Sequence, residues 1–171
     1  YAVTVDNCTN ALFLCMKYLH VETGCNITIP KNTYCSVPCS IINAGGYINF
    51  EERDWEGSYQ LKPYPIYDGA VRFRKNMYSD LYETLRKENN TLHTQNILYC
   101  LSFHRRKPLA IGKGGMILTN CKESYEWFKM ARYEGRDTSV MYKDDVLTSI
   151  GWNMYMTPEQ AAKGLTIFKT L

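Results

Sequence analysis

The chain has 171 residues, of which 45% are hydrophobic, and a formal net charge of +3. This length and composition predict one globular domain with a buried core. The charge is too small for a nucleic-acid-binding surface, and no apolar run is long enough to cross a bilayer. No secretory signal or lipidation motif is present, so we expect a cytoplasmic protein with no nucleic-acid or membrane partner.

The seven cysteines are an odd number, and none forms a Cys-x-x-Cys pair. The three histidines do not stand at metal-ligand spacing from any cysteine pair, so no metal site is predicted. We interpret the cysteines as free thiols that fill small apolar positions of the core in a reducing compartment. A disulfide framework or a zinc site is the alternative interpretation.

The predicted elements of the first half alternate between helix and short strand. Residues 6–19 form an apolar helix, with N-cap oxygens available from Asp6, Asn7 or Thr9 and an end at Gly24. The β-branched residues that follow predict a strand. Up to Asp68-Gly69, the expected elements are a strand at 27–30, a helix at 36–43, and strands at 47–50 and 65–67.

The second half continues the alternation after a polar segment near 74–94, which we interpret as an insertion that contains a helix at 79–87. Strands are expected at 97–101 and 116–119, with a helix at 124–133. A last helix begins after Thr157, which is followed by proline and then by Gln160. This order predicts an α/β, three-layer fold with a central, mostly parallel sheet.

Several polar residues are expected where an open α/β sheet gathers its site, at strand ends and at a helix N-terminus. The start of the first helix, around Cys8 and Thr9, offers free N–H groups and a dipole that suit a phosphate. Asp68 ends one predicted strand, and Ser102 and Lys107 follow another. A lysine at such a junction is well placed to form a Schiff base with a carbonyl cofactor.

Pyridoxal phosphate (PLP) requires these residue types together. Its phosphate needs hydroxyl donors, which Thr9 and Ser102 supply, and its aldehyde needs an amine, which Lys107 supplies. A carboxylate keeps its ring nitrogen protonated, and Asp68 is the candidate. An aromatic side chain commonly covers the ring, and Tyr34 is available for stacking.

Five segments of the chain also resemble, in the same order, motifs of the sugar aminotransferases of the DegT/DnrJ/EryC1/StrS group. The two most specific are Ser-Phe-His-x-x-Lys at residues 102–107 and Gly-x-Asn-x-x-Met followed by Gln-Ala-Ala at residues 151–162. The other three are a phosphate turn at 7–12, a Pro-x-x-Thr-aromatic-x-Ser segment at 30–36, and an Ile-x-Asp-x-Ala segment at 66–70.

The resemblance implies the large-domain core of a fold-type I PLP enzyme, formed by residues 1–171 as a single unit, with the small C-terminal domain missing. Lys107 is then the catalytic residue, and the cofactor contacts are Cys8, Thr9, Tyr34, Asp68, Ser102, Lys107 and Asn153. The implied reaction moves an amino group from a donor such as glutamate to a nucleotide-linked keto-sugar. A homodimer with a shared active site is also implied, since Asn153 reaches the phosphate bound by the partner subunit.

Three positions depart from the family pattern. Cys8 replaces the glycine of the phosphate turn, Val71 replaces a polar residue that contacts the ring hydroxyl of the cofactor, and Lys113 replaces the acidic residue of the family's Gly-Glu-Gly-Gly turn. Because these departures accompany the missing small domain, an alternative function is a shortened PLP-binding or structural protein without transaminase activity. A dehydratase relative is a third possibility, but that branch replaces the lysine with histidine, and Lys107 argues against it.

Overall fold

The computed structural model describes residues 1–170, except the side chains of residues 91 and 92. Its helices are α1 (Cys8–Tyr18), α2 (Ser36–Ala44), α3 (Met77–Lys87), α4 (Thr91–Thr94), α5 (Lys122–Ala131) and α6 (Pro158–Phe168), with a 3₁₀ turn η1 (Tyr142–Asp144). Its strands are β1 (Ala2–Val5), β2 (Asn26–Pro30), β3 (Tyr47–Glu51), β4 (Tyr59–Leu61), β5 (Ile66–Asp68), β6 (Leu98–Ser102) and β7 (Gly115–Leu118).

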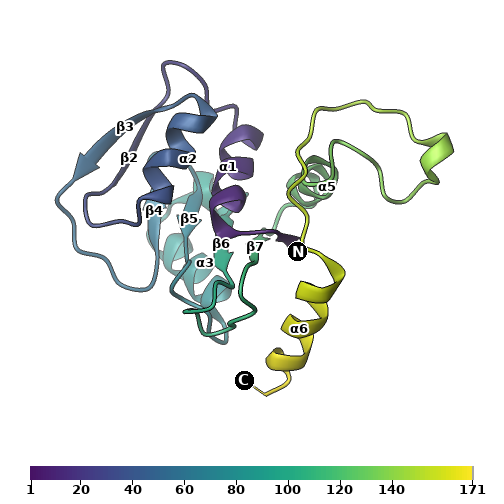
Figure 1. Ribbon diagram of the computed structural model, residues 1–171. Coiled ribbons are helices and arrows are strands. Elements are labelled where there is room, and N and C mark those ends of the chain that lie inside the picture. The colour runs from purple at the N-terminus through teal and green to yellow at the C-terminus, as the bar shows by residue number, and fades with distance from the viewer. Residues whose placement is uncertain (171) are drawn as a thin grey trace.

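Five strands form one sheet in the order β1-β7-β6-β5-β4, and β2 and β3 form a second, two-stranded sheet (Figure 1). The two sheets are joined at one point, where Thr28 and Lys62 exchange both backbone hydrogen bonds, at 2.8 and 3.0 Å. This bridge aligns β2 and β3 with the edge of the larger sheet.

The expected mostly parallel sheet is wrong for the five-stranded sheet. Only β5 and β6 pair in parallel there, while β1–β7, β6–β7 and β4–β5 are antiparallel. The connections explain the difference. A crossover that contains α3 and α4 joins β5 to β6, whereas residues 62–65 and 103–114 contain no helix and return the chain antiparallel.

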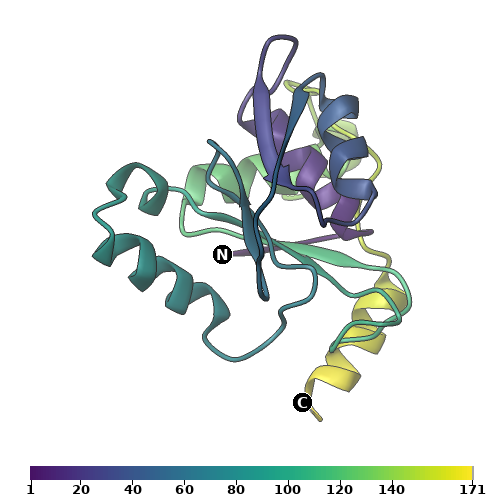
Figure 2. The same cartoon turned by 90° about the vertical axis from the view of Figure 1, so that its left-hand side faces the viewer.

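The sheet lies between two layers of helices, and its side chains alternate between two cores. Leu98 and Cys100 of β6 pack with α1, α2 and α5, while Tyr99 and Leu101 pack on the opposite face with Leu85 of α3. Figure 2 shows α3 and α4 on the side of the sheet away from α1 and α2. The α/β class and the three layers are thus confirmed.

Local sequence signals explain where the helices begin and end. The side chain of Asn7 caps α1 by accepting a hydrogen bond from the N–H of Asn10 at 2.8 Å. Gly45 ends α2 in the left-handed conformation, with φ of 102°. Thr157 and Gln160 form the expected capping box of α6. The first helix, expected at 6–19, ends at Tyr18, and its C-cap is Leu19 rather than the expected Gly24.

Four short elements, β1, β4, α4 and the 3₁₀ turn η1, were not expected from the sequence. All seven cysteines are free thiols. Cys8, Cys15 and Cys100 are buried as expected, but Cys35 and Cys39 are exposed on α2 or at its start, so the core role expected for them is wrong. Among the residues described, no helix is both long and apolar enough to span a membrane.

Candidate active site

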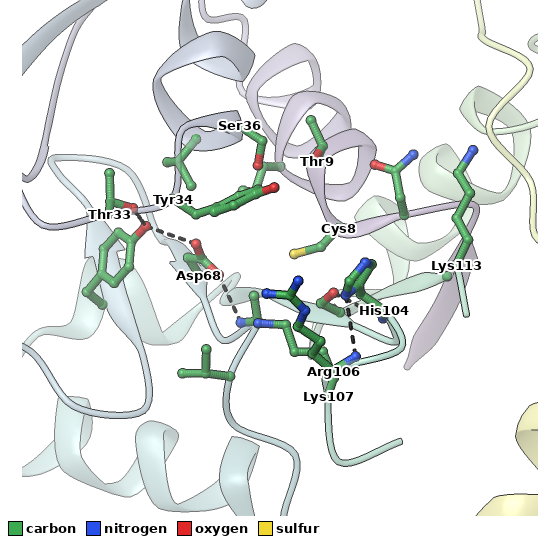
Figure 3. A pocket seen from close by; sticks show the side chains of 18 of the residues that line it. Cys8, Thr9, Thr33, Tyr34, Ser36, Asp68, His104, Arg106, Lys107 and Lys113 are labelled. Atoms are coloured by element: carbon green, nitrogen blue, oxygen red, sulfur yellow. Dashed lines mark hydrogen bonds between the residues drawn. The ribbon is translucent and has the colours of Figure 1, made fainter. Parts of the chain in front are cut away.

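A cavity of about 710 Å³ opens at the ends of β5 and β6, beside the N-terminus of α1. Six of the seven residues expected to contact a cofactor line it, namely Cys8, Thr9, Tyr34, Asp68, Ser102 and Lys107. They come from four separate segments, and Figure 3 shows the side chains of Cys8, Thr9, Tyr34, Asp68 and Lys107 around the same cavity. The fold thus brings most of the predicted site together.

Asp68 is the buried acidic group of this cavity. It is the last residue of β5, with 6% of its surface exposed. Its carboxylate accepts hydrogen bonds from the hydroxyl of Tyr59 and the N–H of Ala70, both at 2.9 Å. Burial raises the pKa of Asp68, against the opposing effects of these two donors and of the Lys107 charge. Among the residues that the structure describes, no cationic side chain forms an ion pair with this carboxyl group.

Tyr59 and Thr33 support Asp68, and neither was assigned a role from the sequence. The hydroxyls of Tyr59 and Thr33 are hydrogen-bonded to each other, so Thr33, Tyr59 and Asp68 form a chain (Figure 3). Burial, and next the negative charge of Asp68, raise the pKa of Tyr59, which keeps its hydroxyl protonated as a donor. No sequence signal marked Tyr59, because the three-residue strand β4 that carries it was not expected.

The N-terminus of α1 forms another wall of the cavity. Within the described residues, the backbone N–H groups of Cys8 and Thr9 have no intramolecular acceptor, whereas the N–H of Asn10 is capped by Asn7. Gly115 of β7 packs against this turn. A Cβ atom there would lie 2.5 Å from the carbonyl carbon of Asn7 and 2.7 Å from the nitrogen of Cys8. The close approach at this turn thus depends on Gly115, while Cys8 occupies the position of the family glycine.

Cys8 places a thiol in the cavity wall, with 9% of its surface exposed. Burial raises the pKa of this thiol well above its usual value, and the charge of Asp68 adds to the effect, while Lys107 opposes it. Cys8 is accordingly a neutral thiol, and its contribution to anion binding is its backbone N–H.

Lys107 enters from the loop between β6 and β7. Its N–H donates to the carbonyl of His104 at 2.8 Å, which closes a turn after Ser102. The side chain is half-buried, and its charge acts on both Asp68 and Cys8. Lys107 thus presents an amine on the side of the cavity opposite Tyr34 (Figure 3).

Tyr34 lies in the loop between β2 and α2, with 74% of its surface exposed. Figure 3 shows its ring across the cavity from Lys107. Val71, which departs from the family pattern, also lines the cavity and is 48% exposed. The side that holds Tyr34 is therefore open to solvent.

Asn153 is the one predicted residue that does not line the cavity. Its backbone pairs with Tyr133, and its amide nitrogen donates to the carboxylate of Glu134 at 2.8 Å. Since Asn153 is exposed, it does not contact the site of its own chain.

Three further cations line the cavity and were not assigned a role from the sequence: Arg105, Arg106 and Lys113. Lys113 lies 3.2 Å from Asp6, which in turn accepts a hydrogen bond from Asn10. The positions were visible in the sequence, since the arginines stand inside the lysine motif and Lys113 replaces an acidic residue of the glycine turn. Their orientation toward the cavity was not.

Comparison with known proteins matches most of the chain. The model of the DegT/DnrJ/EryC1/StrS aminotransferase family matches residues 1–66 and 90–171. GDP-perosamine synthase of Escherichia coli O157:H7 is 26% identical over an alignment 194 residues long, which covers 96% of this chain and 52% of that protein. The chain spans about half the length of the curated relatives it matches.

Solved structures share the fold at low sequence identity. PseC of Helicobacter pylori, an aminotransferase involved in pseudoaminic acid biosynthesis, superposes with a TM-score of 0.73 at 16% identity, over 99% of this chain and 53% of that one. Spr1654 of Streptococcus pneumoniae in its PLP-form gives a TM-score of 0.71 at 16% identity, over 98% of this chain and 54% of that one. The expected fold-type I architecture is thus confirmed.

The unmatched residues 67–89 include Asp68, which is therefore assigned from its geometry rather than from the family match. The matched ranges contain the other predicted contacts, including the lysine motif and the segment around Asn153. Because these ranges make up most of the sequence, the chain belongs to the DegT/DnrJ/EryC1/StrS aminotransferase family.

Proposed function

We propose that this chain binds pyridoxal phosphate in the cavity and forms the cofactor-binding part of a sugar aminotransferase. Its acceptor would be a nucleotide-linked keto-sugar and its amino donor an amino acid such as glutamate. Family membership supports the amino-transfer chemistry. The names of two similar proteins, GDP-perosamine synthase and an aminotransferase of pseudoaminic acid biosynthesis, support a sugar substrate.

The observation that carries the proposal is the state of Asp68. A carboxyl group that is 6% exposed, oriented by two donors and without a cation in contact is suited to the protonated ring nitrogen of PLP. That cation would offset the cost of burying the charge. The hydrogen-bond chain from Thr33 through Tyr59 fixes the carboxylate in place.

The donors around the α1 N-terminus fit the phosphate of the same cofactor. The N–H groups of Cys8 and Thr9 are available, and the hydroxyls of Thr9 and Ser102 line the same cavity. The dipole of α1 adds to the attraction of an anion at this end. Tyr34 would cover one side of the ring.

When bound, PLP supplies an electron sink that stabilises negative charge at the substrate carbon. Lys107 would hold the cofactor through its amine and would later move a proton at that nitrogen as general base and acid. Asp68 would keep the ring nitrogen protonated.

The assembly that we propose is a homodimer in which Asn153 of one chain completes the phosphate site of the other. Asn153 is exposed and lies outside its own cavity, which leaves it available to a second chain. The exposed apolar residues 140–150 that precede it would supply contact area.

An absorbance titration tests the proposal. Purified protein mixed with PLP should develop an absorbance band of bound cofactor, and borohydride reduction with peptide mapping should place the cofactor on Lys107. Lys107→Ala should abolish the band and the label. Lys113→Ala, which removes a lysine of the same cavity, is the matched control and should keep both.

The response to glutamate separates the two functions. Loss of the band on adding glutamate indicates amino transfer, whereas an unchanged band supports a cofactor-binding protein without transaminase activity. Absence of a band in the natural protein, or an equal band in Lys107→Ala, would contradict the cofactor assignment itself.

A further inference from the structure

Positive charge is concentrated at the cavity. Its lining contains four cationic side chains, Arg105, Arg106, Lys107 and Lys113, and a single carboxylate, Asp68. This excess of three positive charges is as large as the net charge of the entire chain, +3. The rest of the surface is therefore close to neutral, and the field of the protein points an anion toward this opening.

Two of these four cations lack an acidic partner. Lys113 is paired with Asp6, and the charge of Lys107 acts on Asp68 although the two groups are not in contact. Within the described residues, neither Arg105 nor Arg106 has a carboxylate within 4.0 Å of its guanidinium or a hydrogen bond from its side chain. Both side chains are exposed, so their planar donor groups are available to a ligand.

The backbone holds this arginine pair in position. The N–H of Arg105 donates to the carbonyl of Gly112 at 3.2 Å, and the flanking Phe103 donates to Gly114 at 2.9 Å. The hydrogen bond from the N–H of Lys107 to the carbonyl of His104 closes a turn that contains both arginines. Figure 3 shows Arg106 and Lys107 rising from this one turn. A ligand held by the arginines is thus kept next to the amine of Lys107.

The arginines are separate from the donors proposed for the cofactor phosphate. Those donors are at the start of α1 and at the end of β6, whereas the arginines occupy the loop at the cavity opening. Trp55, half-buried and fixed by a 2.8 Å hydrogen bond from its indole N–H to Asn32, and Tyr34 supply aromatic surface in the same lining. The cavity therefore combines an anion-binding opening with aromatic surface on other parts of its lining.

We propose that Arg105 and Arg106 form an anion subsite at the cavity mouth that binds the phosphate or carboxylate of the substrate and positions its reacting end at Lys107. This assignment deepens the proposed function, since it gives the substrate of the same site its anchoring residues. Two adjacent guanidinium groups match oxygens of a diphosphate or a carboxylate in the bidentate manner that lysine lacks.

The test measures anion binding by calorimetry on protein loaded with PLP, so that the inner phosphate site is already occupied, and again on unloaded protein. Inorganic pyrophosphate represents a sugar nucleotide, and glutarate represents the amino donor. In Arg105→Gln/Arg106→Gln we expect the Kd of the bound probe to rise roughly 10- to 100-fold, as the loss of charge-assisted hydrogen bonds predicts. Arg105→Lys/Arg106→Lys should give an intermediate rise, because charge remains without the bidentate geometry.

Lys163→Gln/Lys169→Gln is the matched control, since it removes two exposed positive charges from outside the cavity. It should leave the Kd within about twofold, because neither lysine lines the cavity and salt screens the effect of exposed charges that do not contact the ligand. A response limited to pyrophosphate assigns the subsite to the phosphates of the acceptor, and a response limited to glutarate assigns it to the donor. If each probe binds the natural protein and Arg105→Gln/Arg106→Gln with the same Kd, the inference is overturned.

The two proposals fail in different ways. The absorbance band of bound PLP should be unchanged in Arg105→Gln/Arg106→Gln, since these residues do not hold the cofactor. If the natural protein shows no band, the cofactor assignment fails, while the titration of unloaded protein still decides the arginine subsite. If the band is present and the arginine substitutions do not alter anion binding, only the subsite is wrong.

Discussion

The floor of the cavity and the segment 136–150 are built in opposite ways. The floor is buried and held by strands from distant parts of the sequence, with Asp68 and Cys8 exposed by 6% and 9%. Segment 136–150 extends away from the body of the molecule (Figure 1) and exposes apolar side chains, with Tyr142 at 80% and Ile150 at 83%. Tertiary packing therefore determines the floor, whereas local contacts determine the segment.

The local contacts of that segment are specific. Arg136 forms a 3.0 Å ion pair with the buried carboxylate of Asp145 and lies 4.4 Å above the ring of Tyr142. At its base, Gly151 packs so closely that a Cβ atom would lie 2.0 Å from the nitrogen of Gly135. The segment has a defined shape but leaves its apolar side chains uncovered, which a single folded chain rarely does over a continuous surface.

The largest effect should come from the floor, in Gly115→Ala. The added methyl group would meet backbone atoms of Asn7 and Cys8, which cannot move without displacing the start of α1. We expect a loss of about 3 kcal/mol in the free energy of unfolding and loss of cofactor binding, as for an overpacked core. Chemical denaturation and the PLP absorbance titration measure both.

Gly24→Ala is the control for this substitution. Gly24 has a φ of 102° but nothing within 4 Å of an added Cβ atom, so only conformational strain of about 1 kcal/mol is expected. Equal losses of stability in the two variants would show that the contact between Gly115 and α1 is not tight.

A smaller effect of opposite sign is expected for Asp68→Asn without cofactor. Burial raises the pKa of Asp68, so this group stabilises the fold fully below its unfolded pKa, and that contribution is lost as pH rises through the folded pKa. At pH 7 the neutral asparagine should therefore raise the free energy of unfolding, by on the order of 1 kcal/mol. Thermal melts across pH should show the gain shrinking as the solution becomes more acidic.

With PLP present the order of the two proteins should reverse, because only the carboxylate offsets the charge of the protonated ring nitrogen. A variant that is less stable than the natural protein without cofactor at neutral pH would mean that the hydrogen bonds from Tyr59 and Ala70 outweigh burial.

The smallest effect on folding should come from the projecting segment, in Leu147→Ser/Ile150→Ser. These side chains are 65% and 83% exposed, so the free energy of unfolding of the single chain should change by no more than about 0.5 kcal/mol. If two chains associate through this surface, the dissociation constant measured by analytical ultracentrifugation should rise. A large loss of stability in the monomer would show that the segment contributes to the core.

The elements that the sequence predicted correctly have strong local signals. The helix at 36–43 precedes two glycines, and the last helix starts with Thr157 and Gln160. β1 and β4 were missed because they are only four and three residues long. The partner of β1 is also distant in the sequence, as the pairing of Ala2 with Leu118 illustrates. Sheet direction was wrong because the alternation of helix and strand does not show which connections lack a helix.

Local motifs also decided which residues of the candidate site could be recognised from the sequence. Asp68, Ser102 and Lys107 stand in motifs that can be read along the chain, and the fold places them in one cavity. Tyr59 has no such motif, so its hydrogen bond to Asp68 became visible only in three dimensions. The separation of Asn153 from the cavity likewise depends on its pairing with Tyr133.

The sequence by itself determined where helices begin, as at Asn7 and Thr157, because a cap depends on atoms within three or four residues. It also determined which chemical groups are available for a cofactor. Only the tertiary structure decided which strands pair, how deeply Asp68 is buried and that Arg105 and Arg106 line the same cavity as Lys107. These properties depend on contacts between segments far apart in the chain, and burial sets the pKa of a group more strongly than its neighbours in sequence do.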